Sequence, residues 1–150
     1  MATTLKTASI VTKITERLVL NGKDFGNITT KTVSGIKDAS QRIFRVLSAA
    51  NGTQIYAGST AVGPGTFIST NVVHIRITNL DASNYVILHL EGSSHYAQFK
   101  LEAGKSFVLG TPVGFDNNAD IDNFSSETIT KIEALANTAN VDVEVFVASK

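Results

Sequence analysis

The chain has 150 residues, of which 43% are hydrophobic and 17% charged, and thirteen basic side chains balance thirteen acidic ones. This length is typical of one domain whose core folds without disulfides or metals. Because cysteine is absent, disulfide scaffolds, thiolate metal sites and cysteine nucleophiles are excluded. The neutral charge argues against nucleic-acid binding, and no run is apolar enough for a signal-peptide core or a membrane span. We therefore expect no nucleic-acid and no membrane partner.

The N-terminal segment, residues 1–15, is rich in threonine and alternates like a strand, with Ile10, Thr12 and Ile14 on one side. This alternation precedes the main β pattern of the chain. A strand outside the main fold can add to the sheet of a neighbour. We predict that residues 1–15 form such an arm and that residues 16–150 form a single β-sandwich domain.

Period-two alternation of apolar and polar residues dominates the rest of the chain and predicts half-buried antiparallel strands. The strongest runs are residues 72–78, 85–91, 97–102 and 141–148, and the weaker ones are 8–14, 16–20, 28–34, 42–48, 54–58 and 106–109. The side chains expected to face the core are Val73, Ile75, Ile77, Val86, Leu88, Leu90, Ala97, Phe99, Leu101, Val141, Val143, Val145 and Val147.

Turn-forming residues separate these runs, as in "NG" (21–22 and 51–52), "NLDASN" (79–84) and "AGK" (103–105). Short strands with such punctuation are typical of a sandwich or a barrel. We predict an all-β fold, a jelly-roll-like antiparallel β-sandwich of about eight to ten short strands.

One segment, residues 125–137, fits two structures. Ser125 or Ser126 before Glu127 would cap a helix, and apolar residues then recur at intervals of three. The same segment is rich in β-branched residues, which favours a strand that places Ile132 inward. We prefer the strand and keep the helix as the alternative.

The longest and most polar loop precedes that segment and contains Asp116, Asp120 and Asp122. Their carboxylates are ligands that calcium accepts. The run "DNNADID", however, lacks the glutamate that closes an EF-hand loop, and no helices flank it. We interpret these residues as a solvated loop.

The triplet Gly104-Lys105-Ser106 ends like a phosphate-binding loop. That loop requires G-x-x-x-x-G-K-[ST] between a strand and a helix, because its glycines let backbone N–H groups surround the phosphates. Here Phe99 stands where the first glycine must be, and the strand-like "FVLG" follows. We predict the turn of a β-hairpin, with Gly104 at positive φ.

The three histidines define a possible metal site. If residues 79–84 close a symmetric hairpin, His74 faces His89 across the ladder, and His95 lies in the next turn. Zinc needs three or four ligands with supporting groups, and no carboxylate can be assigned. The histidines are therefore expected to be ordinary polar residues.

No local signature of catalysis is present. The chain has no G-x-S-x-G motif, so nothing supports a nucleophilic serine. It has no tryptophan and only three tyrosines, which weakens the case for a platform that stacks on sugars or bases. We expect no enzymatic activity, no catalytic, cofactor-binding or metal-binding residues, and no cofactor.

Three stretches of the chain carry a further pattern: "HIRITNLDASNYVILHLEG", "FKLEAGKSFVLG" and "IEALANTANVDVEVFVASK". They resemble the C-terminal two-thirds of small virion structural proteins of tailed bacteriophages, particularly cyanophages. The shared layout is a strand that ends in I-T-N-x-D (Ile77 to Asp81), an "L-x-A-G-K-S-F" hairpin (Leu101 to Phe107) and a final strand (Val141 to Ser149). The front stretch, "LVLNGKDFGNITTKTVSGI", resembles the opening strand pair of the same group.

The resemblance implies a virion protein, assembled in the host cytoplasm, that acts as a building block without chemistry. It favours a capsid decoration or cement protein that self-associates, as a trimer or another symmetric homo-oligomer, and contacts the major capsid protein or another virion protein. The alternative is a tail, neck, fibre or knob component that binds a glycan or a receptor, because jelly rolls also host lectins. An enzyme is the third and least favoured class.

Overall fold

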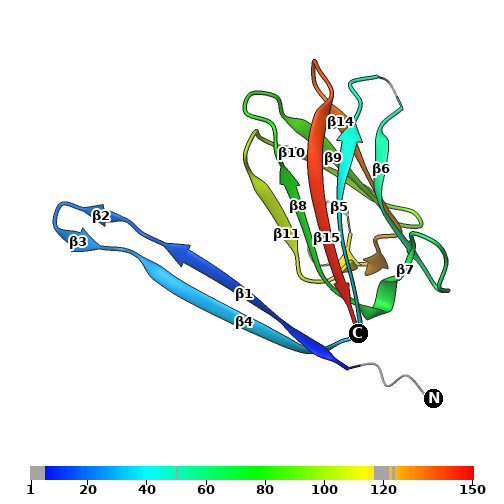
Figure 1. The fold of residues 1–150 in the computed structure, drawn as a ribbon, viewed down its shortest axis with the longest axis horizontal. Helices are drawn as coiled ribbons and strands as arrows, with labels where there is room; N and C mark the ends of the chain where they lie inside the picture. The colour runs from blue at the N-terminus through cyan, green and yellow to red at the C-terminus, as the bar shows by residue number, and fades with distance from the viewer. Residues whose placement is uncertain (1–5, 50, 117–121, 123) are drawn as a thin grey trace. The chain divides into compact units, whose positions relative to one another are not determined.

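The computed structural model describes residues 6–49, 51–116, 122 and 124–150. Chain contacts divide the protein into two compact units, Met1–Lys37 and Asp38–Lys150, whose strands are labelled in Figure 1. The division follows Lys37, whereas the sequence placed the end of the arm at residue 15. The expected arm is thus one strand of a longer element, and its residues 1–5 lie outside the described part.

The first unit is a β-hairpin. Strand β1 (Ala8–Glu16) pairs antiparallel with β4 (Asn27–Ile36), and the short strands β2 (Val19–Leu20) and β3 (Lys23–Asp24) continue the hairpin to its tip. Asn21 and Gly22 close the tip with φ angles of 51° and 77°. Two consecutive positive φ angles define the tight turn that the dipeptide Asn-Gly favours.

The second unit is an antiparallel β-sandwich. One sheet has the order β11-β8-β15-β5, with β5 (Asp38–Val46), β8 (Val72–Asn79), β11 (Ser106–Leu109) and β15 (Val141–Ser149). The other has the order β10-β9-β14-β6-β7, with β6 (Thr53–Ser59), β7 (Phe67–Ile68), β9 (Val86–Glu91), β10 (Tyr96–Leu101) and β14 (Lys131–Ala136). The smaller elements are η1 (Ser69–Asn71), β12 (Val113–Phe115) and β13 (Glu127–Thr128).

The order of the strands is that of a jelly roll. The chain passes from one sheet to the other between β5 and β6, between β7 and β8, between β8 and β9, between β10 and β11, between β11 and β14, and between β14 and β15. These crossings give two interleaved four-stranded sets, and β7 adds a parallel strand beside β6. The predicted fold class is confirmed. Among the described residues, no helix is long and apolar enough to cross a bilayer.

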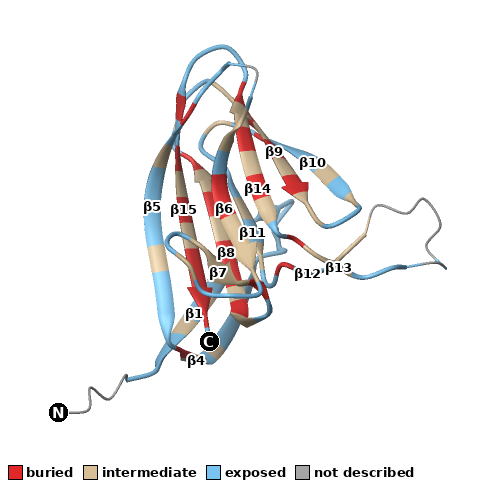
Figure 2. Cartoon of the chain, turned by 90° about the vertical axis from the view of Figure 1, so that its right-hand side faces the viewer, coloured by how far each residue is buried: buried red, intermediate tan, exposed pale blue. Residues whose placement is uncertain are grey.

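The core lies between the two sheets, where the buried positions of their strands meet (Figure 2). The alternation predicted for β8, β9 and β15 is confirmed, with two exceptions on β8: Val72 is buried in place of Val73, and His74, which the alternation places on the polar side, is also buried. On β10 only Leu101 is fully buried, and Phe99 keeps 45% of its surface exposed. The reason is that β10 is an edge strand, so one side of its inward face is open.

The hairpin predicted at residues 103–105 is wrong, and residues 79–84, considered as a hairpin for placing the histidines, do not close one. The strands on either side of each turn, β8 with β9 and β10 with β11, belong to different sheets. Asn79 joins these corners, since its amide donates to the carbonyls of Asn84 and Leu101 and its backbone N–H donates to the carbonyl of Lys105. Sequence spacing shows a turn but not whether the chain changes sheet.

The ambiguous segment 125–137 is extended. It forms β13 and β14, and β14 buries Ile132, Ala134 and Ala136 on one face. The strand is confirmed and the helix is wrong, because a neighbour on each side of β14, β9 and β6, offers the backbone a ladder.

Candidate functional site

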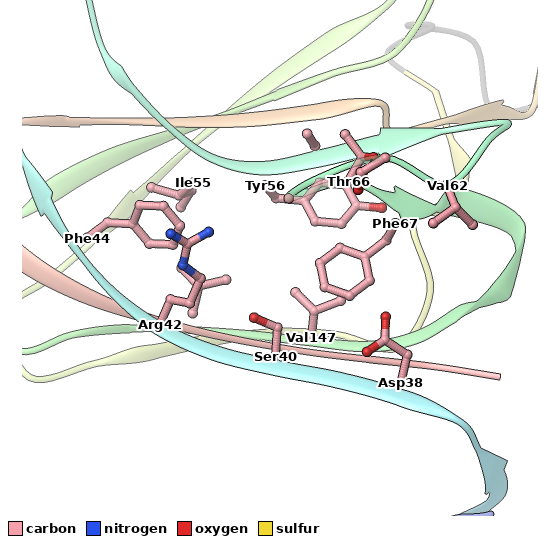
Figure 3. Close-up of a pocket in the computed structure, with 14 residues that line it drawn as sticks. Asp38, Ser40, Arg42, Phe44, Ile55, Tyr56, Val62, Thr66, Phe67 and Val147 are labelled. Carbon is pink, nitrogen blue, oxygen red and sulfur yellow. Dashed lines mark hydrogen bonds between the residues drawn. The ribbon is translucent and has the colours of Figure 1, made fainter. Parts of the chain in front are cut away.

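A groove lies between the edges of the two sheets of the sandwich. Strand β5 forms one wall, and within the described chain it pairs with β15 alone. Strands β6 and β7 and the loop that joins them form the other wall. The groove has a volume of about 320 Å³, and Figure 3 shows the side chains that line it.

The floor of the groove is apolar and aromatic. Phe44 and Val147 reach it from the first sheet, and Tyr56 and Phe67 from the second. The rings of Tyr56 and Phe67 stack with their centroids 6.3 Å apart. Burial raises the pKa of the Tyr56 phenol, and the nearby Ser69 hydroxyl opposes that shift. The Tyr56 ring therefore contributes apolar surface and not a titrating group at neutral pH.

The rim of the groove is polar. Asp38, Ser40 and Arg42 stand at every second position of this strand and line the opening. The guanidinium of Arg42 lies 5.4 Å from the centre of the Phe44 ring. A free strand edge beside an apolar slot suits an extended peptide, which pairs through its backbone and places alternate side chains in the slot. Among the described residues that line the groove there is no histidine, cysteine or lysine to act as a base or nucleophile.

The opposite edge of the sandwich is formed by β10 and β11. Phe99 on β10 and Phe107 on β11 lie with their ring centroids 5.4 Å apart. These two strands belong to different sheets, so the aromatic pair bridges the layers. The sandwich is therefore asymmetric, with one edge bridged by rings and the other accessible to a ligand.

The hairpin is the second candidate surface. Its large apolar side chains are exposed on both faces and at the tip: Val11, Ile14, Leu18, Val19, Leu20, Phe25 and Ile28. The register places Ile14 on one face of the β1–β4 ladder, whereas Val11 and Ile28 lie on the other. A two-stranded hairpin is marginally stable in water by itself. The alternation of residues 8–14 predicted the first strand of this hairpin. That the "NG" turn at 21–22 returns the chain as a second, paired strand was not predicted.

The proposed facing of His74 and His89 is wrong. His74 lies opposite Ala148 in one sheet, and His89 lies opposite Glu133 and Gln98 in the other. Burial lowers the pKa of His74, with Arg76 adding to the effect. The buried His74 ring packs edge-on against Phe146, with the ring centroids 5.8 Å apart. No shared metal site can form from this pair.

His95 lies instead beside carboxylates that the sequence did not assign to it. Its Nδ1 is 3.0 Å from Glu127 Oε1, and its Nε2 is 3.7 Å from Asp116 Oδ1. The backbone N–H of Ser94 holds the pKa of Glu127 down at about 2, helped by the N–H of His95, the Ser93 hydroxyl and the histidine charge. This arrangement fastens the loop after β9 onto β13.

The acidic loop is described only in part. Asp116 and Asp122 are described, whereas Asp120 lies outside the described residues. In the described part of the chain, no group of three or more histidine and acidic side chains is placed to hold a metal ion.

The triplet Gly104-Lys105-Ser106 forms the corner between β10 and β11. Gly104 has the predicted positive φ, 68°, and the N–H of Lys105 donates to the carbonyl of Glu102 over 3.2 Å. A strand follows and no helix N-terminus is present at this place, so the arrangement lacks the anion-binding end of a phosphate loop.

No protein-family model, no curated protein and no solved structure matches the chain. Fold and surfaces therefore define the class by themselves: a jelly-roll sandwich with one accessible edge and an apolar hairpin arm.

Proposed function

We propose that this chain is a non-enzymatic structural protein of a bacteriophage virion, a decoration or cement protein that binds neighbouring subunits through its hairpin arm. The observation that carries the proposal is the arm itself, which exposes large apolar side chains on both faces and buries only Ile36 among its described residues. Full burial of one such side chain contributes about 1.5–3 kcal/mol. A surface of this kind is typical of a segment that becomes buried in an assembly.

The sandwich supports the same function. Its buried core is continuous across both sheets, so the second unit has the packed core that a subunit of an assembly needs. Jelly rolls of this size are common in viral shells, although the fold alone does not assign a function. The resemblance of the corner and strand motifs to virion proteins supports the virion setting.

The test replaces arm side chains without shortening the chain. Val11→Thr, Ile14→Thr and Ile28→Thr together keep strand propensity but remove apolar contact area. The matched control carries Leu80→Thr, Tyr96→Thr and Val108→Thr, three comparably exposed positions of the sandwich.

Association is measured by analytical ultracentrifugation of the pure protein and by co-sedimentation with phage capsids. The arm variant should bind roughly 100-fold more weakly, because three lost contacts of about 1 kcal/mol each give about 3 kcal/mol. The control should bind like the natural chain. Unchanged association of the arm variant in both assays would refute the proposed function.

A further inference from the structure

We infer that the arm of one copy docks in the groove of a second copy, with β1 adding as an extra strand to the free edge of β5. This inference rests on the proposed role of the arm in assembly and names its receptor. It would convert the accessible edge of the sandwich into a continuous sheet between subunits.

The two units carry opposite net charge, although the net charge of the chain is zero. The arm unit has six basic and two acidic side chains, and the sandwich has seven basic and eleven acidic ones. The basic residues of the arm are Lys6, Lys13, Arg17, Lys23, Lys31 and Lys37, and its acidic residues are Glu16 and Asp24. An excess of four positive charges thus belongs to the arm, and an excess of four negative charges belongs to the sandwich.

This segregation favours the sandwich of another copy as the arm's partner, because opposite potentials steer and orient association. The groove itself carries both signs, because Asp38 and Arg42 line it and neither makes an ion pair with a described residue. Lys13 and Lys31 of the arm have no acidic partner among those residues. Asp38 is therefore the group of the groove that can pair with a lysine of another copy's arm.

Strands β5 and β1 match in length, since each has nine residues. Within the described chain β5 pairs only with β15, so its other edge is free to pair with a further strand. Charged side chains usually protect such an edge. Strand β5 carries Asp38, Arg42 and Arg45, but near the middle of the edge Ile43 exposes 64% of its surface.

The faces of β1 also suit this docking. Ile10, Thr12 and Ile14 share one face of the strand. Added to β5, that face would continue the inward face of its sheet and place isoleucines toward the apolar floor of the groove. Val11 and Lys13 would then lie on the outer face, beside Ile43.

Such a contact joins two different surfaces, so it is heterologous. Repeated around an axis it closes a ring of copies, and without closure it would produce a filament. The contact therefore provides a structural basis for a symmetric homo-oligomer.

The experiment uses the absence of natural cysteines. Full-length chains with Val11→Cys are mixed with chains carrying Ile43→Cys, and a short bismaleimide joins thiols that lie close together. The control partner is Val108→Cys, because Val108 is 51% exposed and lies on the outer face of the same sheet, on the opposite edge strand β11. The Val11–Ile43 mixture should give a crosslinked dimer at least about tenfold faster than the control, since docking gives two thiols a millimolar effective concentration.

Raising the salt concentration should lower the yield of this dimer, because the arm and the sandwich carry opposite charge. Equal yields from the Ile43 and Val108 partners would overturn the groove as the receptor while the role of the arm stands. If neither mixture crosslinks but the threonine arm variant still loses capsid binding, the partner is another virion protein and the second copy is overturned. If that variant binds capsids normally and does not lose self-association, the proposed function itself falls.

Discussion

The two units of this chain are both built from β-strands, yet they differ in where their apolar side chains point. In the sandwich, β9 and β14 place Leu88 and Ile132 in a core from which water is excluded. In the arm, β1 leaves Val11 and Ile14 more than half exposed. Strand pairing alone therefore does not make a stable unit, because a second sheet is needed to bury the apolar side chains of the first.

The largest expected change in the free energy of unfolding comes from shortening a buried side chain of the sandwich, compared with an exposed side chain of the arm. Leu88→Ala should lower the free energy of unfolding by about 2–5 kcal/mol, because it leaves a cavity between the sheets. Val11→Ala in the arm should change it by less than about 0.5 kcal/mol, as expected for an exposed position. Chemical denaturation followed by circular dichroism measures both. A comparable loss from Val11→Ala at low protein concentration would mean that the arm belongs to the cooperative core.

A smaller loss of stability should follow from replacing Asn79, whose hydrogen bonds join two corners of the sandwich. Its fully buried side chain donates to two carbonyls and accepts from the N–H of Asp81. Asn79→Ala should cost about 1–3 kcal/mol, because buried backbone groups lose their partners. Thermal unfolding measures this loss. Asp142→Ala, at an exposed side chain of β15, is the control and should leave the melting temperature nearly unchanged.

The smallest effect should be a dependence on pH that is confined to the sandwich. The folded-state pKa of Glu127 is about 2, below its usual value of 4.5. The carboxylate therefore stabilises the fold fully above pH 4.5, and this contribution is lost as the pH falls toward 2. Melting curves should show a shallower acid dependence for Glu127→Gln than for the natural chain. Glu133→Gln, a carboxylate of β14 paired with Lys131, serves as the control, and identical acid slopes for all three proteins would argue against the Glu127 loop contacts.

The local part of the fold was predictable. The Val141 to Val147 alternation gave the correct inward face, because side chains of a strand alternate by geometry. The Asn21-Gly22 dipeptide also marked a turn, because these two residues tolerate positive φ. Both inferences depend only on neighbouring residues, and for this reason they did not require the tertiary structure.

Of the two candidate surfaces, only the first strand of the arm could be predicted from the sequence, and the groove could not. Threonine-rich alternation at Ile10 to Ile14 indicated an arm, but the groove combines residues of β5 with residues of β6, β7 and β15 that are distant in sequence. The pairing of His74 with His89 failed for the same reason, since it assumed that neighbouring strands share a sheet. The charge segregation was present in the sequence, but it becomes visible only when the boundary after Lys37 is known.

The sequence by itself therefore determined an all-β chain, its inward faces, its turns and the absence of cysteine chemistry, because each follows from residue type and local periodicity. Only the tertiary structure decided which strands share a sheet, which edge stays open and where the arm ends. Those properties arise from the long-range pairing of strands, in which a turn such as "NLDASN" or "AGK" serves equally well as a hairpin or as a corner between sheets. Asn79, through the hydrogen bonds that join two corners, is the residue at which this choice is visible.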